Sequence, residues 1–497
     1  MDTERLDPEH CYRALAARDR RFDGRFFVGV ASTGIYCRPV CPARTPKQTN
    51  CTFYPSAAAA ETAGFRPCLR CRPETAPGSP AWTGTSATVA RAMRLIAEGA
   101  LDDASVEELA ARVGIGGRHL RRLFRQELGT TPAAAAQTHR AHLAKKLLDE
   151  TSLSMGQVAL AAGYRDVRRF NAGIRRSWQR SPTELRRQRA QPAAAESVIR
   201  LRLAYRPPLD WEEWLGFLRP RLIPGVETID GATYRRGVST HGVSGVIALS
   251  ASPRDDSLLL QASLSLAPAL PALVERARVF ADLRADPGEI AAHLRRDPRL
   301  RTLVRRRPGL RIPGAWDPFE TAVRAVLGQQ VTVAAATTLA GRIVARFGAP
   351  AAQGDGDEGG STLVAFPAAA VLAGADLSGL GLTEARIRTV TTLAGAVADG
   401  TLDLSGAADP AGQVRILQTL PGIGPWTAAY IAMRVLGDPD AFPASDLGLL
   451  KALETEGVRP APAAAERIAE TWRPWRSYAV MHLWAAALPR SSQGEKP

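Results

Sequence analysis

The chain has 497 residues, 45% of them hydrophobic, and a formal net charge of +15 at pH 7. This length allows three or four domains with ordinary packed cores. The sequence lacks both a run of about 18 apolar residues and a signal-peptide core, so we expect a cytoplasmic protein without a membrane segment. Residues 1–190 hold 31 Lys and Arg against 18 Asp and Glu, whereas the rest holds 33 against 31. A basic front half indicates a polyanionic partner such as nucleic acid.

All six cysteines lie within the first 71 residues, and four of them form two closely spaced pairs. These pairs are Cys37 with Cys41 and Cys68 with Cys71. In a cytoplasmic chain this spacing is typical of a tetrahedral zinc–thiolate site rather than of disulfides. We therefore expect one Zn²⁺ per chain, held by these four residues. Cys11 and Cys51 have no such partners and are expected to be small buried hydrophobic residues.

The residues around the cysteines, 33–44 (TGIYCRPVCPAR) and 64–71 (GFRPCLRC), closely resemble the N-terminal domain of the adaptive-response (Ada) proteins. The resemblance implies that Cys37 accepts a methyl group from a DNA phosphotriester and that Arg44 contacts phosphate. A zinc-bound sulfur stays a thiolate, the nucleophilic form. Four thiolates on Zn²⁺ carry a net charge of about 2−, and methylation of Cys37 lowers it to about 1−, so affinity for DNA should rise. For Arg44, a solvated surface charge remains the alternative.

Residues 86–190 contain an internal repeat of about 50 residues, in which the Ala-x3-Gly motif at 110–114 returns at 159–163. A small residue followed four positions later by a turn glycine suits two closely crossing helices, as in a helix-turn-helix. The second, Arg-rich helix of each copy is expected near 117–127 and 166–176. The pattern resembles the AraC-type tandem DNA-binding domain, and a helical scaffold with charged outer faces is the alternative. The expected DNA contacts are Arg121, Arg122, Arg168 and Arg169.

Residues 198–270 alternate apolar and polar side chains, for example at 198–203 (VIRLRL), and therefore predict strands. From about residue 271 onward the pattern is helical. Three stretches rich in Pro, Gly, Ser or Thr predict breaks in the fold, the last of them a flexible insertion. They are residues 73–85, 190–197 and 350–361.

Residues 420–428 (LPGIGPWTA) have the pattern of a helix, a tight glycine turn and a second helix, the helix-hairpin-helix. Gly422 and Gly424 leave backbone N–H groups free at a helix N-terminus, where they can bind phosphate. A carboxylate, Asp446, follows 22 residues after Gly424, and a Trp-rich run ends at Trp484. An ordinary helix cap is the alternative role for Asp446.

This arrangement resembles the AlkA-type 3-methyladenine glycosylases of the helix-hairpin-helix superfamily over about 198–487, including 206–211 (RPPLDW) and 322–330 (AVRAVLGQQ). The resemblance implies that an alkylated base is flipped into an aromatic pocket. An alkylated purine is already cationic and leaves without a strong general acid, while Asp446 stabilises the oxocarbenium charge and orients water. The implied pocket residues are Trp426, Tyr430, Trp484 and Gln330. Gln330 stands where an apolar wedge would fill the gap left by the base, and its polarity departs from that role. Trp472 and Trp475 are expected in the core.

Three absences narrow the expected chemistry. Related lyase-type glycosylases carry Lys at the position of Trp426, so no Schiff-base nucleophile is expected there. Cysteines are absent beyond position 71, so their iron–sulfur cluster is missing. A Pro-Cys-His-Arg-like motif is also absent, and repair of O-methylated guanine is not expected.

The expected fold is multidomain α+β. It comprises a small zinc-bound α/β domain (1–78), an all-α tandem helix-turn-helix (84–190), an α+β TBP-like subdomain (197–310) and an all-α helix-hairpin-helix glycosylase core (311–490).

The expected function is alkylation-damage repair in a bacterium. A monofunctional glycosylase of the DNA-3-methyladenine glycosylase II type is coupled to a methyl acceptor and a transcription-regulatory module. The expected partners are alkylated and promoter double-stranded DNA, and RNA polymerase for a regulator; the chain should be a nucleoid-associated monomer. Two alternatives remain: a transcription regulator whose glycosylase half only binds DNA, and a glycosylase whose front half is merely a DNA-targeting anchor.

Overall fold

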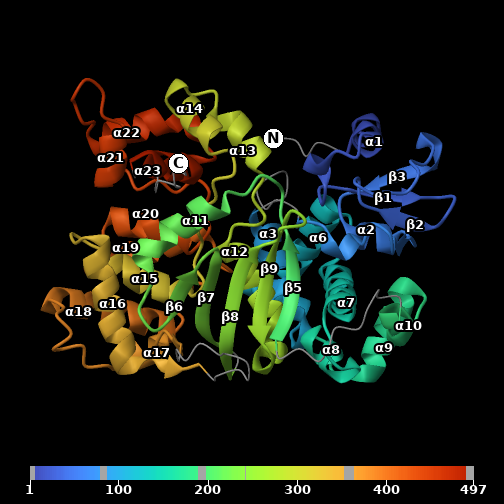
Figure 1. Ribbon diagram of the computed structural model, residues 1–497, viewed down its shortest axis with the longest axis horizontal. Helices are drawn as coiled ribbons and strands as arrows, with labels where there is room; N and C mark the ends of the chain where they lie inside the picture. Colours follow the sequence, from blue (N-terminus) through green and yellow to red (C-terminus); the bar gives the residue numbers. More distant parts are fainter. Residues whose placement is uncertain (1–5, 79–86, 188–197, 241, 352–362, 488–497) are drawn as a thin grey trace, which may run out of the picture.

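A computed structural model describes residues 6–78, 87–187, 198–240, 242–351, 363–487. A five-stranded sheet lies at the centre, with the N-terminal domain to its upper right and the C-terminal helices to its upper left (Figure 1). The predicted breaks at 190–197 and 350–361 lie largely outside the described residues. Among the described helices, none has the length and apolar character needed to cross a bilayer.

The N-terminal domain is a four-stranded sheet of order β3-β1-β2-β4, antiparallel except for the parallel pair β2 and β4. It is therefore a small domain with a mixed sheet and two short helices, where a small zinc-bound α/β domain was expected. The cysteine pairs lie around the ends of β2 and β4, which the parallel pairing brings together. The elements are α1 (Pro8–Ala16), β1 (Phe27–Val30), β2 (Ile35–Cys37), β3 (Cys51–Tyr54), α2 (Ala57–Thr62) and β4 (Arg66–Pro67).

The following region is entirely helical, and both predicted recognition helices are confirmed as helices, α6 and α9. The preceding helix of each unit begins with a capping box, in which the side chains of Ser105 and Ser154 accept from the backbone N–H groups of Glu108 and Gln157. The helices are α3 (Ala87–Ala97), α4 (Ala100–Asp103), α5 (Val106–Arg112), α6 (Gly117–Leu128), α7 (Pro132–Glu150), α8 (Met155–Ala161), α9 (Val167–Trp178) and α10 (Pro182–Arg187).

The predicted strands of residues 198–270 form an antiparallel sheet of order β5-β9-β8-β7-β6. Alternate residues of β5 are buried, as its sequence pattern requires. Two helices accompany the sheet, and the tryptophans of α11 lie in the core beneath it. The elements are β5 (Val198–Ala204), α11 (Trp211–Leu218), β6 (Glu227–Asp230), β7 (Thr233–Thr240), β8 (Val243–Ala251), β9 (Ser257–Ser263) and α12 (Leu270–Phe280).

The last part is helical except for one short ribbon, β10 with β11, which corrects the expectation of an all-α core. The ribbon forms because Val364 donates its N–H to the carbonyl of Gly225 and lies against β7. The elements are α13 (Pro287–Leu294), α14 (Pro298–Arg306), α15 (Pro318–Leu327), α16 (Val333–Phe347), β10 (Ala349–Pro350), β11 (Val364–Ala365), α17 (Ala369–Ala373), α18 (Glu384–Ala398), α19 (Pro410–Thr419), α20 (Pro425–Arg434), α21 (Leu447–Ala452), α22 (Pro462–Ala469) and α23 (Arg476–Ala487).

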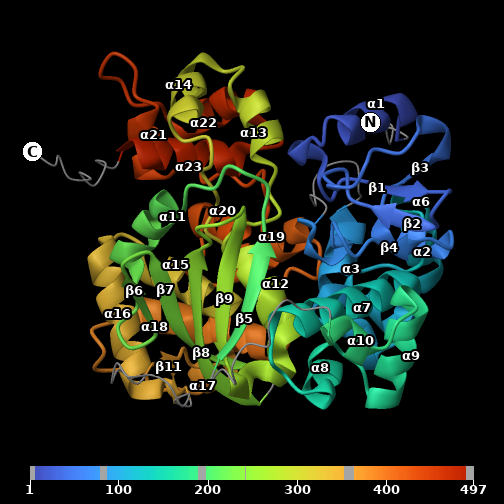
Figure 2. The same ribbon diagram turned by 45° about the vertical axis from the view of Figure 1, so that its right-hand side comes forward.

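The helix-turn-helix region packs directly on the central sheet (Figure 2). One continuous hydrophobic core runs from α7 through α10 into the sheet and the C-terminal helices. The N-terminal domain is joined more through polar contacts: Arg206 donates to the carbonyls of Asp23 and Gly78 at 2.9 Å each, and Arg25 pairs with Asp286. Within the described residues, the N-terminal domain, the helix-turn-helix region, the sheet and the C-terminal helices therefore contact one another.

Candidate functional site

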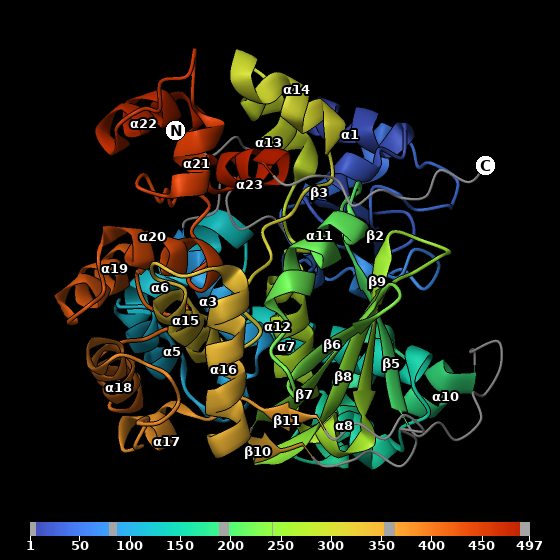
Figure 3. The same ribbon diagram turned by 60° about the vertical axis from the view of Figure 1, so that its left-hand side comes forward.

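The predicted hairpin consists of α19, a glycine turn and α20, which lie beside α15 and α16 (Figure 3). Gly422 has a φ of +82°, and a Cβ there would lie 2.1 Å from Oγ1 of Thr389, so both backbone conformation and space require glycine. Gly424 is the N-cap of α20 and Pro425 follows it at the first helical position. The turn thus presents backbone N–H groups at a helix N-terminus, the arrangement that binds phosphate.

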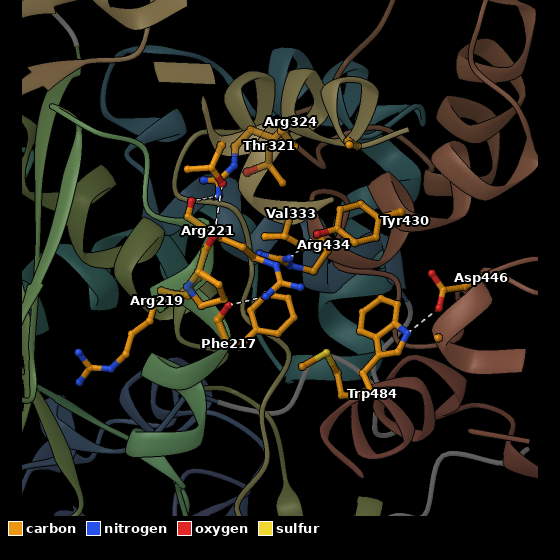
Figure 4. Close-up of a pocket in the computed structure, with 18 of the residues that line it drawn as sticks. Phe217, Arg219, Arg221, Thr321, Arg324, Val333, Tyr430, Arg434, Asp446 and Trp484 are labelled. Carbon is orange, nitrogen blue, oxygen red and sulfur yellow. Dashed lines mark hydrogen bonds between the residues drawn. The ribbon is translucent and has the colours of Figure 1, made fainter. Parts of the chain in front are cut away.

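Asp446 is the N-cap of α21, and three donors hold its carboxylate. Trp426 donates its indole N–H to Oδ2 at 3.0 Å. Trp484 donates its indole N–H to Oδ1 at 2.9 Å (Figure 4). The backbone N–H of Leu449 also donates to Oδ1, at 2.8 Å. The cap role and a position inside an aromatic site, which the sequence left as alternatives, therefore occur together.

The aromatic side chains predicted for the pocket lie together around Asp446. The rings of Trp426 and Tyr430 stack with centroids 5.5 Å apart, and Tyr430 and Trp484 are 6.2 Å apart. All three line a cavity of about 2030 Å³ that also reaches Asp446, Gln330 and the glycine turn. Trp472 and Trp475 are buried outside this lining, as expected.

The inner end of the cavity is rich in arginine, which sequence reasoning missed (Figure 4). Arg434 donates to the hydroxyl of Tyr430 at 2.7 Å, and the guanidinium of Arg221 stacks 3.9 Å above the ring of Phe217. Burial by itself would raise the pKa of Tyr430, but Arg434, Arg221 and Arg324 together hold it below its ordinary value. The four-residue helical spacing of Tyr430 and Arg434 was the available signal in the sequence.

Gln330 stands exposed at the cavity with a left-handed φ of +56°. Its neighbour Gln329 fixes the loop, because its side-chain amide donates to the carbonyl of Gly422 at 2.9 Å and to Oγ1 of Thr427 at 2.8 Å. The loop that carries Gln330 is thereby tied to the glycine turn and to α20.

The four paired cysteines come together in the N-terminal domain, with their sulfur atoms all within 4.8 Å of one another. A tetrahedral thiolate site with metal–sulfur bonds of about 2.3 Å places its sulfurs about 3.8 Å apart. Four sulfurs gathered within 4.8 Å of one another are therefore close enough to bind one ion after small side-chain adjustments. Cys41, Cys68 and Cys71 are buried, whereas Cys37 is partly exposed. Cys37 is thus the thiol that a molecule from solvent can reach.

The two remaining cysteines lie apart from this cluster. Cys11 is buried in a hydrophobic cluster, and burial, aided by Asp7, raises the pKa of its thiol to about 11. Cys51 is only partly buried against the same cluster. The expectation of a small buried side chain therefore holds for Cys11 and only partly for Cys51.

The arginines predicted to contact DNA lie mostly on exposed surfaces. Arg44, Arg122, Arg168 and Arg169 are exposed. Arg121 is partly exposed and pairs with Glu107 of α5 at 2.7 Å, so a DNA contact would have to replace that ion pair.

Three protein families match successive parts of the chain. They are the metal binding domain of Ada (residues 10–74), a helix-turn-helix domain (109–188) and the AlkA N-terminal domain (200–317). The resemblances seen in the sequence are thereby confirmed.

Named relatives extend this similarity. The "Probable bifunctional transcriptional activator/DNA repair enzyme AlkA" of Mycobacterium tuberculosis (strain H37Rv) is 44% identical over 482 residues, 96% of each chain. The DNA-3-methyladenine glycosylase 2 of Escherichia coli K12 is 36% identical over 57% of this chain and 95% of its own. The bifunctional transcriptional activator/DNA repair enzyme Ada of the same organism is 37% identical over 32% of this chain and 44% of its own.

Among solved structures, the 3-methyladenine DNA-glycosylase from Archaeoglobus fulgidus has a TM-score of 0.51 at 21% identity. The aligned region covers 57% of this chain and 97% of that structure, and this similarity supports a shared fold.

Proposed function

The chain belongs to the family of bifunctional transcriptional activators and DNA repair enzymes that includes AlkA of Mycobacterium tuberculosis, and from this premise we propose how its two halves divide the work. The C-terminal part, from about residue 198 onward, releases alkylated purines from DNA as a monofunctional glycosylase. The front half accepts methyl groups from phosphotriesters and binds promoter DNA. The observation that carries the first assignment is the carboxylate of Asp446, held by the indole N–H groups of Trp426 and Trp484 at an aromatic cavity.

Asp446 stabilises the positive charge that develops on the sugar as the bond to the base breaks. The flipped base stacks on the aromatic rings, which favour an electron-poor, cationic purine. The backbone N–H groups after Gly422 and Gly424 bind a phosphate of the same strand. Lysine is absent at the position of Trp426, so water rather than an amine completes the reaction and leaves an intact abasic site.

The test is release of methylated purines from DNA by the full chain and by Asp446→Asn. The variant should lose at least about 10²-fold in rate while still binding damaged DNA, because a carboxylate that acts on developing charge matters little in the ground state. Asp409→Asn is the matched control, because Asp409 caps α19 in the same way but does not line the cavity. Binding without any base release would favour the alternative in which this half only binds DNA. Strand cleavage accompanied by a Schiff base between enzyme and DNA, which borohydride would trap, would contradict the monofunctional mechanism.

The four clustered cysteines fit one zinc ion, which would keep their sulfurs as thiolates. Cys37 is the methyl acceptor in this proposal, supported by its partial exposure beside three buried partners. Its sulfur attacks the methyl carbon of a phosphotriester. The new S–C bond forms as the C–O bond breaks, and the phosphodiester leaves with its negative charge. Cys37 ends as a thioether, and the site becomes less negative toward DNA.

Helices α6 and α9 are proposed to enter successive major grooves of promoter DNA, with Arg121, Arg122, Arg168 and Arg169 at their exposed N-terminal halves. Arg44 is proposed as a phosphate contact beside the methyl acceptor. A monomer that recruits RNA polymerase would complete the regulatory function. If methylation of Cys37 leaves promoter affinity unchanged, the front half is better understood as a DNA-targeting anchor.

A further inference from the structure

A second cavity, of about 280 Å³, lies where the N-terminal domain, the helix-turn-helix region and the part built on the five-stranded sheet meet. Helix α3 packs against both α7 and α12 (Figure 2), and all three helices line the cavity. Its volume is close to the lower end of the range of about 300–1,000 Å³ that is usual for ligand sites. The cavity can therefore hold a small molecule but not a segment of duplex DNA.

The walls of this cavity carry an excess of positive charge. The charged side chains that line it are Arg94, Lys146, Arg278, Arg284, Glu74 and Glu275. Four cations against two carboxylates leave two positive charges in excess. Three of the cations have ion-pair partners, since Arg278 and Arg284 both pair with Glu275 and Lys146 pairs with Glu150 at 3.3 Å.

Arg94 is the one cation of this lining that forms no ion pair or hydrogen bond with the described residues. Its Nε and Nη2 atoms are buried without a hydrogen-bond partner. Glu98, which follows α3 directly, attracts this guanidinium, but burial raises the pKa of that carboxyl, so it is a poor counter-ion. A buried guanidinium without a partner costs free energy, and a bound anion would remove that cost.

The surroundings of Arg94 suit the oxygens of a phosphate group. Its Nη2 packs against Gly406 of the loop before α19, where a Cβ would lie only 2.3 Å away, so the guanidinium is held in place. His139 of α7 lines the same cavity, and burial lowers its pKa to about 4, which leaves a neutral ring that can donate one hydrogen bond. The planar fork of arginine matches phosphate oxygens, and a dianionic phosphate balances two excess positive charges.

We propose that this cavity binds one small phosphate-bearing anion, either inorganic phosphate or a mononucleotide. The anion accepts hydrogen bonds from Arg94 and His139, and it stabilises the junction of the three parts of the chain. The site is separate from the one that releases bases, because this cavity and the cavity of Asp446 share no lining residue.

The experiment titrates the full chain by calorimetry, at constant ionic strength, with orthophosphate, deoxyadenosine monophosphate and deoxyadenosine. We expect one saturable site for the two phosphates. Arg94→Met should weaken it at least about tenfold, and Arg94→Lys, which keeps the charge but loses the fork, should weaken it less. Arg91→Met is the matched control, because Arg91 lies one turn earlier on α3 but does not line the cavity.

The arms of the titration identify the ligand. Tighter binding of the mononucleotide than of orthophosphate would assign a nucleotide to the cavity, and equal affinities would assign the free ion. Lack of saturable binding by both phosphates would overturn the site. Equal affinity for deoxyadenosine would do the same, as would an equal loss in Arg91→Met, which would show that phosphate merely collects on a basic surface.

Thermal unfolding separates a ligand site from a structural arginine. Without phosphate, Arg94→Met should have a higher Tm than wild type, because it removes a buried charge that lacks a partner. Added orthophosphate should raise the Tm of wild type and of Arg91→Met but leave that of Arg94→Met unchanged. A lower Tm of Arg94→Met both with and without phosphate would mean that Arg94 only supports the fold, and would overturn the site.

Discussion

Removing the indole N–H groups that hold Asp446 tests whether its orientation matters for catalysis. Trp426→Phe and Trp484→Phe each delete one donor while keeping an aromatic ring in the cavity wall. The two oxygens differ in support: Oδ1 accepts from Trp484 and from the backbone of Leu449, whereas Oδ2 accepts from Trp426 alone among the described residues. We therefore expect the larger loss in Trp426→Phe.

The magnitude follows from the charge on the acceptor. A hydrogen bond to a charged group contributes about 1.5–3 kcal/mol, and each 1.36 kcal/mol corresponds to roughly tenfold in rate. Trp426→Phe should therefore lower the rate of base release by roughly ten- to a hundredfold. Trp484→Phe should lose less, because the N–H of Leu449 still fixes Oδ1 at 2.8 Å.

Single-turnover release of a methylated purine at saturating enzyme isolates the chemical step. The double variant should lose less than the product of the two single losses, because both donors orient one group. A faster rate in either variant would refute the reasoning: it would mean that the indoles weaken the carboxylate by sharing its negative charge. Equal losses in the two single variants would remove the assigned role of Leu449.

Three further outcomes follow from other parts of the chain. Cys41→Ser and Cys68→Ser should each lose the zinc that wild type retains after dialysis at one ion per chain, and unchanged metal content would contradict the four-cysteine site. Methylation of Cys37, verified by mass spectrometry, should raise promoter affinity about fivefold or more, with a smaller gain at higher salt; equal titrations before and after methylation would remove the switch. His482 is 4% exposed, and burial, with Arg307 nearby, lowers its pKa to about 4. As the pH is lowered through about 6.5, this imidazole becomes protonated in the unfolded chain but stays neutral in the folded chain. The free energy of unfolding therefore decreases as the pH decreases. From pH 7 to 5 wild type should lose about 2 kcal/mol more in urea unfolding than His482→Gln, and parallel curves would count against the neutral buried imidazole.

The local features of the fold could be predicted from the sequence. Glycine turns, helix caps and the alternation in β5 depend on neighbours within a few residues, so α6, α9 and the hairpin turn at Gly422 could be placed in advance. The cysteine cluster could also be predicted, because metal ligation constrains the spacing of its residues. Sites that require particular residue types at a particular spacing are therefore the features most easily predicted from a sequence.

Contacts across long distances in the sequence could not be predicted in this way. The inner end of the cavity joins Phe217 and Arg221 of the sheet half to Arg434 of α20, more than two hundred residues later. In an arginine-rich chain, the sequence alone does not distinguish a buried arginine of the cavity from an arginine on the surface. The β10–β11 ribbon likewise depends on the carbonyl of Gly225, which no local pattern connects to Val364.

The contacts between the two halves bear on how they can act on DNA. Ala407, from the loop before α19, is buried in the core of the first helix-turn-helix unit, which also includes Ala58 of the N-terminal domain. On the other side, Glu150 of α7 accepts from the backbone N–H of Arg202 in β5 at 2.9 Å. Domains move freely when their interface is small and polar, but an apolar shared core holds them together. A duplex bound to α6 and α9 would therefore meet the cavity of Asp446 in one fixed orientation. Separating the chain into two fragments between 187 and 198 would expose apolar side chains of that core.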